Sequence, residues 1–340
     1  MSDVTSVMRL EDSLLLDDIF DNLRQGGLNE FYPTQAGYKF EDGTTIGKCM
    51  RALWFEKLGI TGEKLSLRTR HIFEFGNLLE AYVIENHKRL GIYWKEQVPF
   101  TWIIRDIILR GRFDEIVVLD GKPVGVEIKS GSGYNFLRQH IAGYKRGPQK
   151  KSQPHLINQM QPAPKPEHLL QAAIYLLFTN TQLVPYTGGL TIDEWRLEYR
   201  ATDTKLGAEY RITLEENSGL HKVKVHRIYV SSNAEFESDE PLIDYSQIEL
   251  KEHIEEIVLK DIYVEKILER FLNVYDYIKK GIVPPADYDY TVENGKTRDW
   301  QCEYCPFSYL CKSMSRGEVD GNYLTIASDS LKHYTIATGR

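Results

Sequence analysis

Two carboxylates and a lysine stand in a segment rich in β-branched and aromatic residues. Asp114 ends the run Gly-Arg-Phe-Asp, and Glu127 and Lys129 lie two positions apart in Val-Glu-Ile-Lys. Residues two apart on a strand point to the same face, so Glu127 and Lys129 face the same way. If the two segments are neighbouring strands, Asp114 approaches Glu127, and the pair forms a hard-oxygen site suited to Mg²⁺ or Mn²⁺. A metal held there could polarise a phosphate and acidify a bound water, which is the chemistry of phosphodiester hydrolysis.

The surrounding residues decide between two interpretations of this pattern. An isolated Glu-x-Lys on a strand is more often a cross-strand charge pair at the surface. Here a predicted helix before the strands carries Glu80, and a predicted helix after them carries Gln171 and Tyr175 four residues apart on one face. This context favours a reactive site, while the surface charge pair stays open as the alternative.

The segments that must position these side chains follow an α/β order. The stretch 98–129 is rich in Ile, Val and aromatic residues with a tight Asp-Gly-Lys-Pro turn, which predicts a strand meander. Further strands are predicted over 195–201, 209–215 and 222–230, and helices over 8–25, 49–59, 71–90, 167–180 and 245–280. Apolar positions predict that the 71–90 helix packs on the sheet; they are Ile72, Phe75, Leu78, Leu79, Tyr82 and Val83. The order predicts an α/β core with attachments.

Four cysteines form a second group of chemical interest. Cys302, Cys305 and Cys311 give a C-x2-C-x5-C spacing, and Cys49 stands alone far upstream. Four thiolates can hold either zinc or an iron–sulfur cluster. A structural zinc site more often has two C-x2-C pairs, so the single pair shifts the balance modestly towards iron–sulfur. Buried free cysteines remain the alternative, although three within so short a segment are unusual for core packing.

A basic segment lies between the meander and the 167–180 helix. Residues 130–166 contain no Asp or Glu, and their cations are Arg138, Lys145, Arg146, Lys150, Lys151 and Lys165. Aromatic and imidazole rings are interleaved with them, at Tyr134, Phe136, His140, Tyr144 and His155. Cations for phosphates and rings for base stacking suit single-stranded nucleic acid. A solvated basic loop is the alternative interpretation.

The composition of the whole chain limits its class. The formal charge of −7 argues against coating of nucleic acid by bulk electrostatics, so any DNA contact must be local. No stretch is long and apolar enough for a membrane span, and the first residues are too acidic for a signal peptide, which predicts a cytoplasmic protein. No phosphate-binding loop motif is present, so any unwinding of DNA must come from another protein.

The order of the motifs resembles a known family. The runs G-N-L-L-E (76–80), G-R-F-D (111–114), V-E-I-K (126–129) and Q-A-A-I-Y (171–175) resemble those of RecB-like nucleases of the PD-(D/E)XK superfamily. The resemblance implies a restriction-endonuclease-like core in which a central mixed sheet is flanked by helices. It implies a metal held by Asp114, Glu127, the Ile128 carbonyl and Glu80, with Asp114, Glu127, Lys129, Gln171 and Tyr175 as catalytic residues. Relatives carry histidine or glutamate at the position of Glu80.

The cysteine segments extend the resemblance. K-C-M-R-A-L-W-F (48–55) and W-Q-C-E-Y-C-P-F-S-Y-L-C (300–311) resemble the cysteine motifs of the iron–sulfur members of this group, among them CRISPR-associated RecB-like exonucleases and AddB-type nucleases. The resemblance implies a 4Fe–4S cluster held by Cys49, Cys302, Cys305 and Cys311, which ties the two chain ends into a helical periphery. Met50 stands where relatives commonly have proline, and the strands over 200–245 exceed a minimal family domain.

These observations lead to one expected organisation and function. The expected parts are an N-terminal helical part (1–95), a nuclease core (96–200), a strand-rich insertion (201–245), a helix with the cysteine triad (246–315) and a tail (316–340). The expected function is metal-dependent DNA hydrolysis, with exonuclease action on single-stranded or unwound ends preferred over endonuclease action. A helicase, a recombination protein or a CRISPR-adaptation protein is the expected partner. A catalytically idle DNA-binding adaptor with the same fold is the alternative.

Overall fold

A computed structural model of the chain describes a defined set of residues. These are 27–60, 62, 67–131, 136, 139–140, 163–181, 189, 191–202, 206–230, 255–293 and 296–315. The helix predicted over 8–25 and the tail over 316–340 lie outside them, as do positions 245–254 of the predicted long helix.

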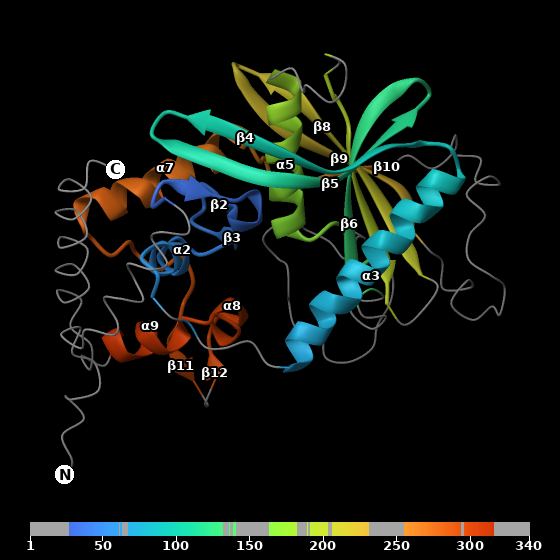
Figure 1. Cartoon of the computed structure of the whole chain (residues 1–340). Helices are drawn as coiled ribbons and strands as arrows, with labels where there is room; N and C mark the ends of the chain where they lie inside the picture. The colour runs from blue at the N-terminus through green and yellow to red at the C-terminus, as the bar shows by residue number, and fades with distance from the viewer. Residues whose placement is uncertain are drawn as a thin grey trace, which may run out of the picture.

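An eight-stranded mixed sheet forms the centre of the molecule (Figure 1). Seven strands follow the order β1-β5-β6-β7-β8-β9-β10, and β4 also pairs with β5. Their bounds are β1 Glu30–Phe31, β4 Tyr93–Ile104, β5 Ile107–Leu119, β6 Lys122–Gly131, β7 Trp195–Ala201, β8 Gly207–Asn217, β9 Leu220–Val230 and β10 Glu255–Ile257. The β1–β5 and β6–β7 pairs are parallel and the others antiparallel. The predicted meander is therefore confirmed as β4, β5 and β6.

Strands β8 and β9 continue the same sheet from β7 across residue 200. Six residue pairs join β7 to β8, from Trp195 with Ile212 to Arg200 with Gly207. Strand β9 then pairs along most of β8. The described strands of the predicted insertion over 201–245 thus widen the central sheet.

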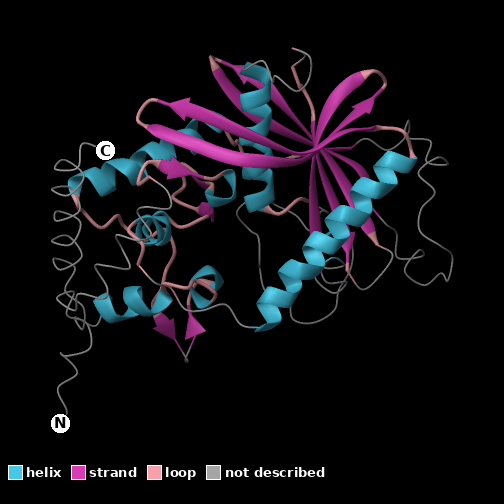
Figure 2. Cartoon of the chain, in the orientation of Figure 1, coloured by secondary structure: helices cyan, strands magenta, loops and turns pink. Residues whose placement is uncertain are grey.

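Helices cover both faces of the sheet (Figure 2). Helix α5 (Pro166–Thr181) is buried along almost its whole length and packs against β7 and β8, because its sequence is apolar on every side. Helix α3 (Leu67–Arg89) packs on β6 through Val83 and Ile84, which join Val126 and Ile128 in a separate apolar cluster. The protein is therefore an α/β fold with a central mixed sheet between helices.

The remaining elements lie around the ends of the described chain. They are the short 3₁₀ helix η2 (Pro33–Gln35), the hairpin β2 (Gly37–Lys39) and β3 (Thr45–Gly47), helices α2 (Met50–Lys57), α7 (Val264–Lys280), α8 (Trp300–Glu303) and α9 (Ser308–Ser315), and the hairpin β11 (Val292–Glu293) and β12 (Lys296–Thr297). Helix α7 ends at Gly281, whose φ of 65° is left-handed, as the sequence predicts. Helix α2 contacts α7.

One expectation about the helices was wrong and another was right only in part. The long helix begins at Val264, because residues 255–257 are the edge strand β10. Helix α3 packs on the sheet as expected, through Val83 with Ile84 and His87, but the other predicted apolar positions that are exposed are Ile72, Phe75, Leu78 and Tyr82. Helical periodicity identifies an apolar face but does not say which element covers it.

No helix in the described ranges is both long and apolar enough to cross a membrane.

Candidate functional site

A cavity of about 280 Å³ brings the predicted catalytic residues together. Its lining includes every residue expected to act in catalysis, together with one arginine and a short N-terminal segment. The lining residues are Tyr32, Pro33, Thr34, Gly111, Arg112, Asp114, Glu127, Lys129, Gln171 and Tyr175. Strands β5 and β6 and helix α5 supply the reactive groups. We refer to this space as the carboxylate cavity.

Glu127 lies at the centre of the contacts in the carboxylate cavity. Its Oε1 accepts hydrogen bonds from Lys129 Nζ at 2.5 Å and from Gln171 Nε2 at 2.6 Å. Its Oε2 is buried, and it has no hydrogen-bond partner in the described part of the chain. A buried carboxylate oxygen without a partner is costly in a folded protein. This oxygen is free to bind a ligand.

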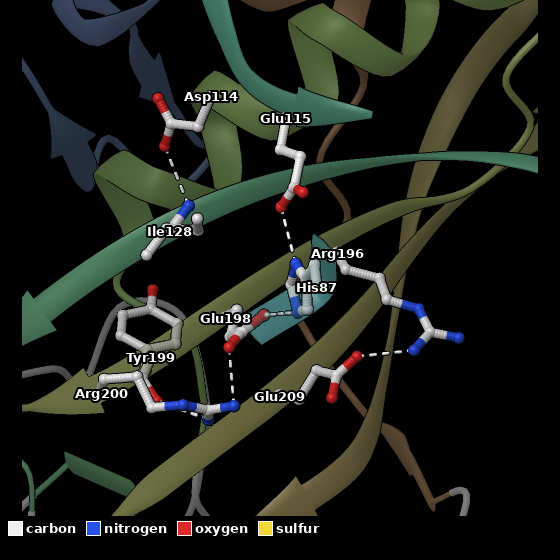
Figure 3. Close-up of polar contacts among 9 residues, drawn as sticks. All are labelled: His87, Asp114, Glu115, Ile128, Arg196, Glu198, Tyr199, Arg200 and Glu209. Carbon is white, nitrogen blue, oxygen red and sulfur yellow. Dashed lines mark hydrogen bonds and ion pairs between the residues drawn. The ribbon is translucent and has the colours of Figure 1, made fainter. Parts of the chain in front are cut away.

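Asp114 stands where the alternation of β5 changes phase. Phe113 and Ile116, three residues apart, both belong to the core under α5, whereas Glu115 contacts α3. The Oδ2 atom of Asp114 accepts the backbone N–H of Ile128 at 2.9 Å (Figure 3). This bond fixes one oxygen of Asp114 beside the backbone that leads from Glu127 to Lys129. The carbonyl of Ile128 was the expected ligand, and the contact that the structure shows is through its N–H.

Helix α5 presents Gln171 and Tyr175 to the carboxylate cavity, as their spacing predicts. Gln171 Nε2 also donates to the Tyr175 hydroxyl at 2.9 Å, and that hydroxyl donates to the carbonyl of Arg112 at 3.4 Å. The Tyr175 ring packs against Phe113 and Trp195, with ring centroids 5.0 Å and 5.2 Å away. Packing and hydrogen bonds thus hold the Gln171 amide in one orientation beside Glu127.

Glu80 of α3, which the resemblance implies as a metal ligand, does not line the carboxylate cavity, although its charge acts on Glu127. Its Oε1 accepts a hydrogen bond from Gln97 Nε2 in β4. Gln97 has a φ of 54°, in the left-handed region that strains a non-glycine residue, and it lies between the pairs Val98–Phe113 and Glu96–Glu115. Gly76 allows the close approach of α3, because a Cβ there would lie 3.1 Å from Ser130 Oγ.

The electrostatics of the carboxylate cavity show an excess of negative charge. Burial raises the pKa of Glu127 to about 8, and the charges of Asp114 and Glu80 add to this rise while Lys129 opposes it. Burial also raises the pKa values of Asp114 and Glu80. The pKa of Lys129 is raised because the nearby carboxylates outweigh the effect of burial. Three carboxyl groups therefore lie near few positive charges, and an added cation would favour their ionised forms.

The four cysteines line a second cavity, of about 200 Å³. Cys49 is the N-cap residue of α2, Cys302 lies in α8, Cys305 follows α8, and Cys311 lies in α9. Burial raises the pKa of the Cys302 thiol to about 12, and the other three thiols add to the rise. The structure therefore brings together all four residues that the sequence singled out. We refer to this space as the cysteine cavity.

Several contacts other than the thiols hold Cys49 near the C-terminal loop. Asp287 accepts the backbone N–H of Met50 at 2.6 Å and forms a buried ion pair with Arg270 of α7. Arg51 Nε donates to the carbonyl of Pro284 at 2.8 Å, and the Tyr288 hydroxyl donates to the carbonyl of Gly47 at 2.7 Å. The cysteine cavity is thus formed by protein contacts as well as by the cysteines.

Most residues predicted to bind DNA in the basic segment fall outside the described residues: Tyr134, Arg138, Lys145, Arg146, Lys150 and Lys151. Phe136 is described and is 2% exposed. Its ring packs against His140, with ring centroids 4.8 Å apart. Its position is therefore that of a core residue, in contrast to the exposed ring that base stacking requires.

Sequence reasoning missed three residues at these sites. Arg112 lines the carboxylate cavity, and its charge opposes part of the rise that burial causes in the pKa values of Asp114 and Glu80. Gln97 is a polar residue in a strand, and this alone does not indicate a site residue. Asp287 follows Pro284-Pro285, where an acidic residue looks like an ordinary loop residue. Only Arg112 could have been found, because it lies inside the Gly-Arg-Phe-Asp run.

In the described ranges, no three His, Cys, Asp or Glu side chains converge as ligands of one metal ion. In the carboxylate cavity, the side chains are arranged as hydrogen-bonded pairs.

Comparisons with known proteins do not identify the chain. No protein-family model matches it, and no curated protein matches it. Among solved structures, the crystal structure of SSO0001 is similar at 15% sequence identity, over 89% of this chain and 96% of that one, with a TM-score of 0.37. A likeness at this TM-score carries no argument.

Proposed function

We propose that this protein is a metal-dependent nuclease that hydrolyses DNA phosphodiester bonds. The observation that supports the proposal is the carboxylate cavity, where Asp114, Glu127 and Lys129 meet and Glu127 Oε2 is buried without a hydrogen-bond partner in the described part of the chain. This arrangement agrees with the resemblance of the motifs to RecB-like nucleases of the PD-(D/E)XK superfamily.

The donor set fits a divalent cation. Glu127 Oε2 and Asp114 offer carboxylate oxygens within the cavity lining, and the Ile128 carbonyl stands between Glu127 and Lys129 in the sequence, whereas Glu80 is not part of that lining. Hard oxygen donors of this kind suit Mg²⁺ or Mn²⁺. When bound, such an ion polarises a phosphate and lowers the pKa of a bound water.

The side chains of the cavity have separate tasks in this proposal. Lys129 keeps its proton, because its pKa is raised, so it donates hydrogen bonds and offsets negative charge that develops on the phosphate. Gln171 holds Oε1 of Glu127 and leaves Oε2 for the cation. Tyr175 orients Gln171, and Arg112 offers a cation to a DNA phosphate at the exposed side.

The cysteine cavity fits a 4Fe–4S cluster by its donor set. Four thiols from two distant segments line it, and Arg51 Nη1 lies 4.0 Å from Cys311 Sγ. Cluster ligation by thiolates needs such a set. The proposed role is structural: the cluster adds a crosslink between segments that the contacts of Asp287 and Tyr288 already join. Purification without oxygen should give a brown protein, whereas a zinc protein would be colourless.

Cleavage of end-labelled DNA tests the proposal. Single- and double-stranded substrates are incubated with Mn²⁺, with Mg²⁺ or with a chelator, and the wild type is compared with Glu127→Gln and Lys129→Ala. Lys122→Ala is the matched control, because Lys122 is an exposed lysine on the same strand. Both site variants should lose about 10² to 10⁴-fold in rate, the usual contribution of such groups.

One result would contradict the proposed enzymatic activity. If the wild type binds DNA and retains its cluster but cleaves no substrate with either metal, the protein is a non-catalytic DNA-binding adaptor. Incubation with closed circular DNA, which has no free end, distinguishes endonuclease from exonuclease action. A requirement for a free end would support the preferred exonuclease on single-stranded or unwound DNA.

A further inference from the structure

A buried charge network lies behind the carboxylate cavity, on the sheet face that α3 covers (Figure 3). His87 of α3 contacts Glu115 through Nδ1 at 2.6 Å and Glu198 through Nε2 at 3.4 Å. Glu198 is also paired with Arg200 at 2.6 Å. The three residues His87, Glu115 and Glu198 are at most 8% exposed. We refer to Glu115, His87, Glu198 and Arg200 as the His87 network.

The His87 network connects the two strands that flank β6. Glu115 belongs to β5 and pairs in register with Val126, and Glu198 belongs to β7 and pairs with Ile128. Val126 and Ile128 face α3, so Glu127, between them, faces the carboxylate cavity. His87 therefore spans β6 on the side opposite Glu127.

The same register places both carboxylates of the cavity beside this network. Asp114 directly precedes Glu115 in β5, and Figure 3 shows the two side chains leaving the strand separately, one to the N–H of Ile128 and the other to His87. A displacement of β5 relative to β6 would move Asp114 relative to Glu127. The backbone ladder of β5 and β6 begins at the pair Glu115–Val126, so the position of Asp114 just before it also depends on what holds the Glu115 side chain.

We propose that His87 is a positioning residue of the metal site: it draws Glu115 and Glu198 together across β6 and thereby fixes the spacing of Asp114 and Glu127. The inference rests on the proposed function, because the metal site is its object. His87 provides the positive charge between two buried carboxylates, and like charges left facing each other in a low-dielectric interior repel.

The mechanism predicts an effect on cation binding. Without His87, Glu115 and Glu198 lose their common partner, and β5 and β7 lose a side-chain contact that bridges them across β6. The backbone pairing of the strands remains, and the Asp114 side chain keeps its hydrogen bond from the N–H of Ile128. Loss of a group that orients a metal ligand from behind typically costs 10 to 100-fold in affinity. We expect His87→Gln to raise the half-saturating Mn²⁺ concentration about tenfold.

The test measures Mn²⁺ binding directly. Electron paramagnetic resonance of free Mn²⁺ gives the binding curve of the wild type with its cluster, and Glu127→Gln identifies the part of the curve that belongs to the carboxylate cavity. Val83→Ala is the matched control, since Val83 lies on the same helix and packs on β6 but makes no part of the His87 network. All variants are compared at a temperature where circular dichroism shows them folded.

A double variant separates positioning from general stability. In His87→Gln/Glu115→Gln, the lone carboxylate facing Glu198 is removed together with the imidazole, so the repulsion disappears. This variant should bind Mn²⁺ more tightly than His87→Gln alone. A purely structural role predicts the opposite, because two deletions in one network would weaken the fold further. In cleavage assays, saturating Mn²⁺ should restore most of the rate of His87→Gln.

Each outcome of the Mn²⁺-binding test either supports or overturns the positioning role of His87. Equal half-saturation in His87→Gln and Val83→Ala, with wild-type binding and cleavage intact, overturns the positioning role and leaves the nuclease standing. Failure of the wild type to bind Mn²⁺ in the carboxylate cavity overturns both proposals. A weaker curve in His87→Gln, with recovery in the double variant, supports the inference.

Discussion

The two faces of the sheet surround their buried carboxylates with different numbers of positive charges. On the face toward α5, Glu127 pairs with Lys129, which is half-buried, and Glu127 Oε2 has no hydrogen-bond partner in the described ranges. On the face toward α3, Glu115 and Glu198 both contact His87 and Glu198 also pairs with Arg200, although Glu115 Oε1 likewise has no hydrogen-bond partner in the described ranges. The two groups of side chains lie on opposite sides of the same strand, β6.

The consequence appears in the pKa values. On the α3 face, the pKa of Glu198 falls to about 2, because Arg200 and His87 outweigh the effect of burial. On the α5 face, burial prevails and the pKa of Glu127 rises to about 8. The pKa of Glu115 is also raised by burial, although His87 opposes the rise, so the contrast is between Glu127 and Glu198. Glu127 keeps one buried oxygen that an added cation could satisfy.

The largest expected effect tests this contrast through stability. Glu198→Gln leaves the buried charges of His87 and Arg200 short of a partner, which should cost about 3 to 5 kcal/mol in the free energy of unfolding. Glu127→Gln removes a carboxylate whose ionised form is disfavoured by burial, so it should be neutral or stabilising in the absence of metal. Urea denaturation with a chelator present measures both.

A destabilisation of Glu127→Gln as large as that of Glu198→Gln would show that the two faces do not differ. Glu215→Gln is the control, because Glu215 is an exposed residue of the neighbouring strand β8 and its pair with Lys224 is open to solvent.

A divalent cation bound in the carboxylate cavity should stabilise the folded protein and so reduce the difference between the two faces. Mn²⁺ at about 100 times its dissociation constant should stabilise the wild type by about 2.7 kcal/mol, because it binds only the folded state. Glu127→Gln should lose this increment, while Glu85→Gln, an exposed change on α3, should keep it. Thermal unfolding at increasing Mn²⁺ gives the increment, and equal gains in the two variants would place the ion elsewhere.

The cysteine cavity offers a smaller test of the same principle. Asp287 pairs with Arg270 and caps α2 at Met50, so Asp287→Asn should cost about 1 to 3 kcal/mol. Cluster occupancy, measured by iron content and visible absorption, should also fall, since Cys49 loses its support. Asp289→Asn is the control, because Asp289 lies in the same loop and its pair with Arg298 is largely exposed. Undiminished iron in Asp287→Asn would assign the positioning to the thiols alone.

The smallest expected change is the loss of stability over a single pH unit in the alkaline range. Hydrogen bonds to Glu115 and Glu198 overcome burial and raise the pKa of His87 from 6.5 to about 10. A raised pKa gives stability that is complete below pH 6.5 and is lost as the pH rises through about 10, with a slope of at most about 1.4 kcal/mol per pH unit. Urea midpoints between these limits should fall with pH in the wild type and fall less in His87→Gln. Parallel curves would mean that His87 is neutral in the folded protein.

Local patterns predicted the parts of the site that depend on sequence spacing. Glu127 and Lys129 share a face because strands alternate, and Gln171 and Tyr175 share a face because helices repeat. The meander, α5 and strands β7 to β9 followed from the same periodicities. The grouping of all four cysteines around one cavity was also expected.

The rest depends on contacts between segments far apart in the sequence. His87 looks like an ordinary residue on the last turns of a helix, and only the register of β5, β6 and β7 brings Glu115 and Glu198 to it. Phe136 lies in a basic segment but is buried, since composition does not specify depth. The phase change at Asp114 likewise appears only when the strands are paired.

The contacts around Cys49 also constrain when the protein can fold during its synthesis. Met50 and Asp287 are 237 residues apart in the chain, and Gly47 and Tyr288 are 241 residues apart. The segment around Cys49 therefore leaves the ribosome long before the loop that holds it, and contacts of such large separation form late because a long loop must close first. The cysteine cavity therefore forms late, and the proposed cluster can be held by all four cysteines only after the chain has been made as far as Cys311.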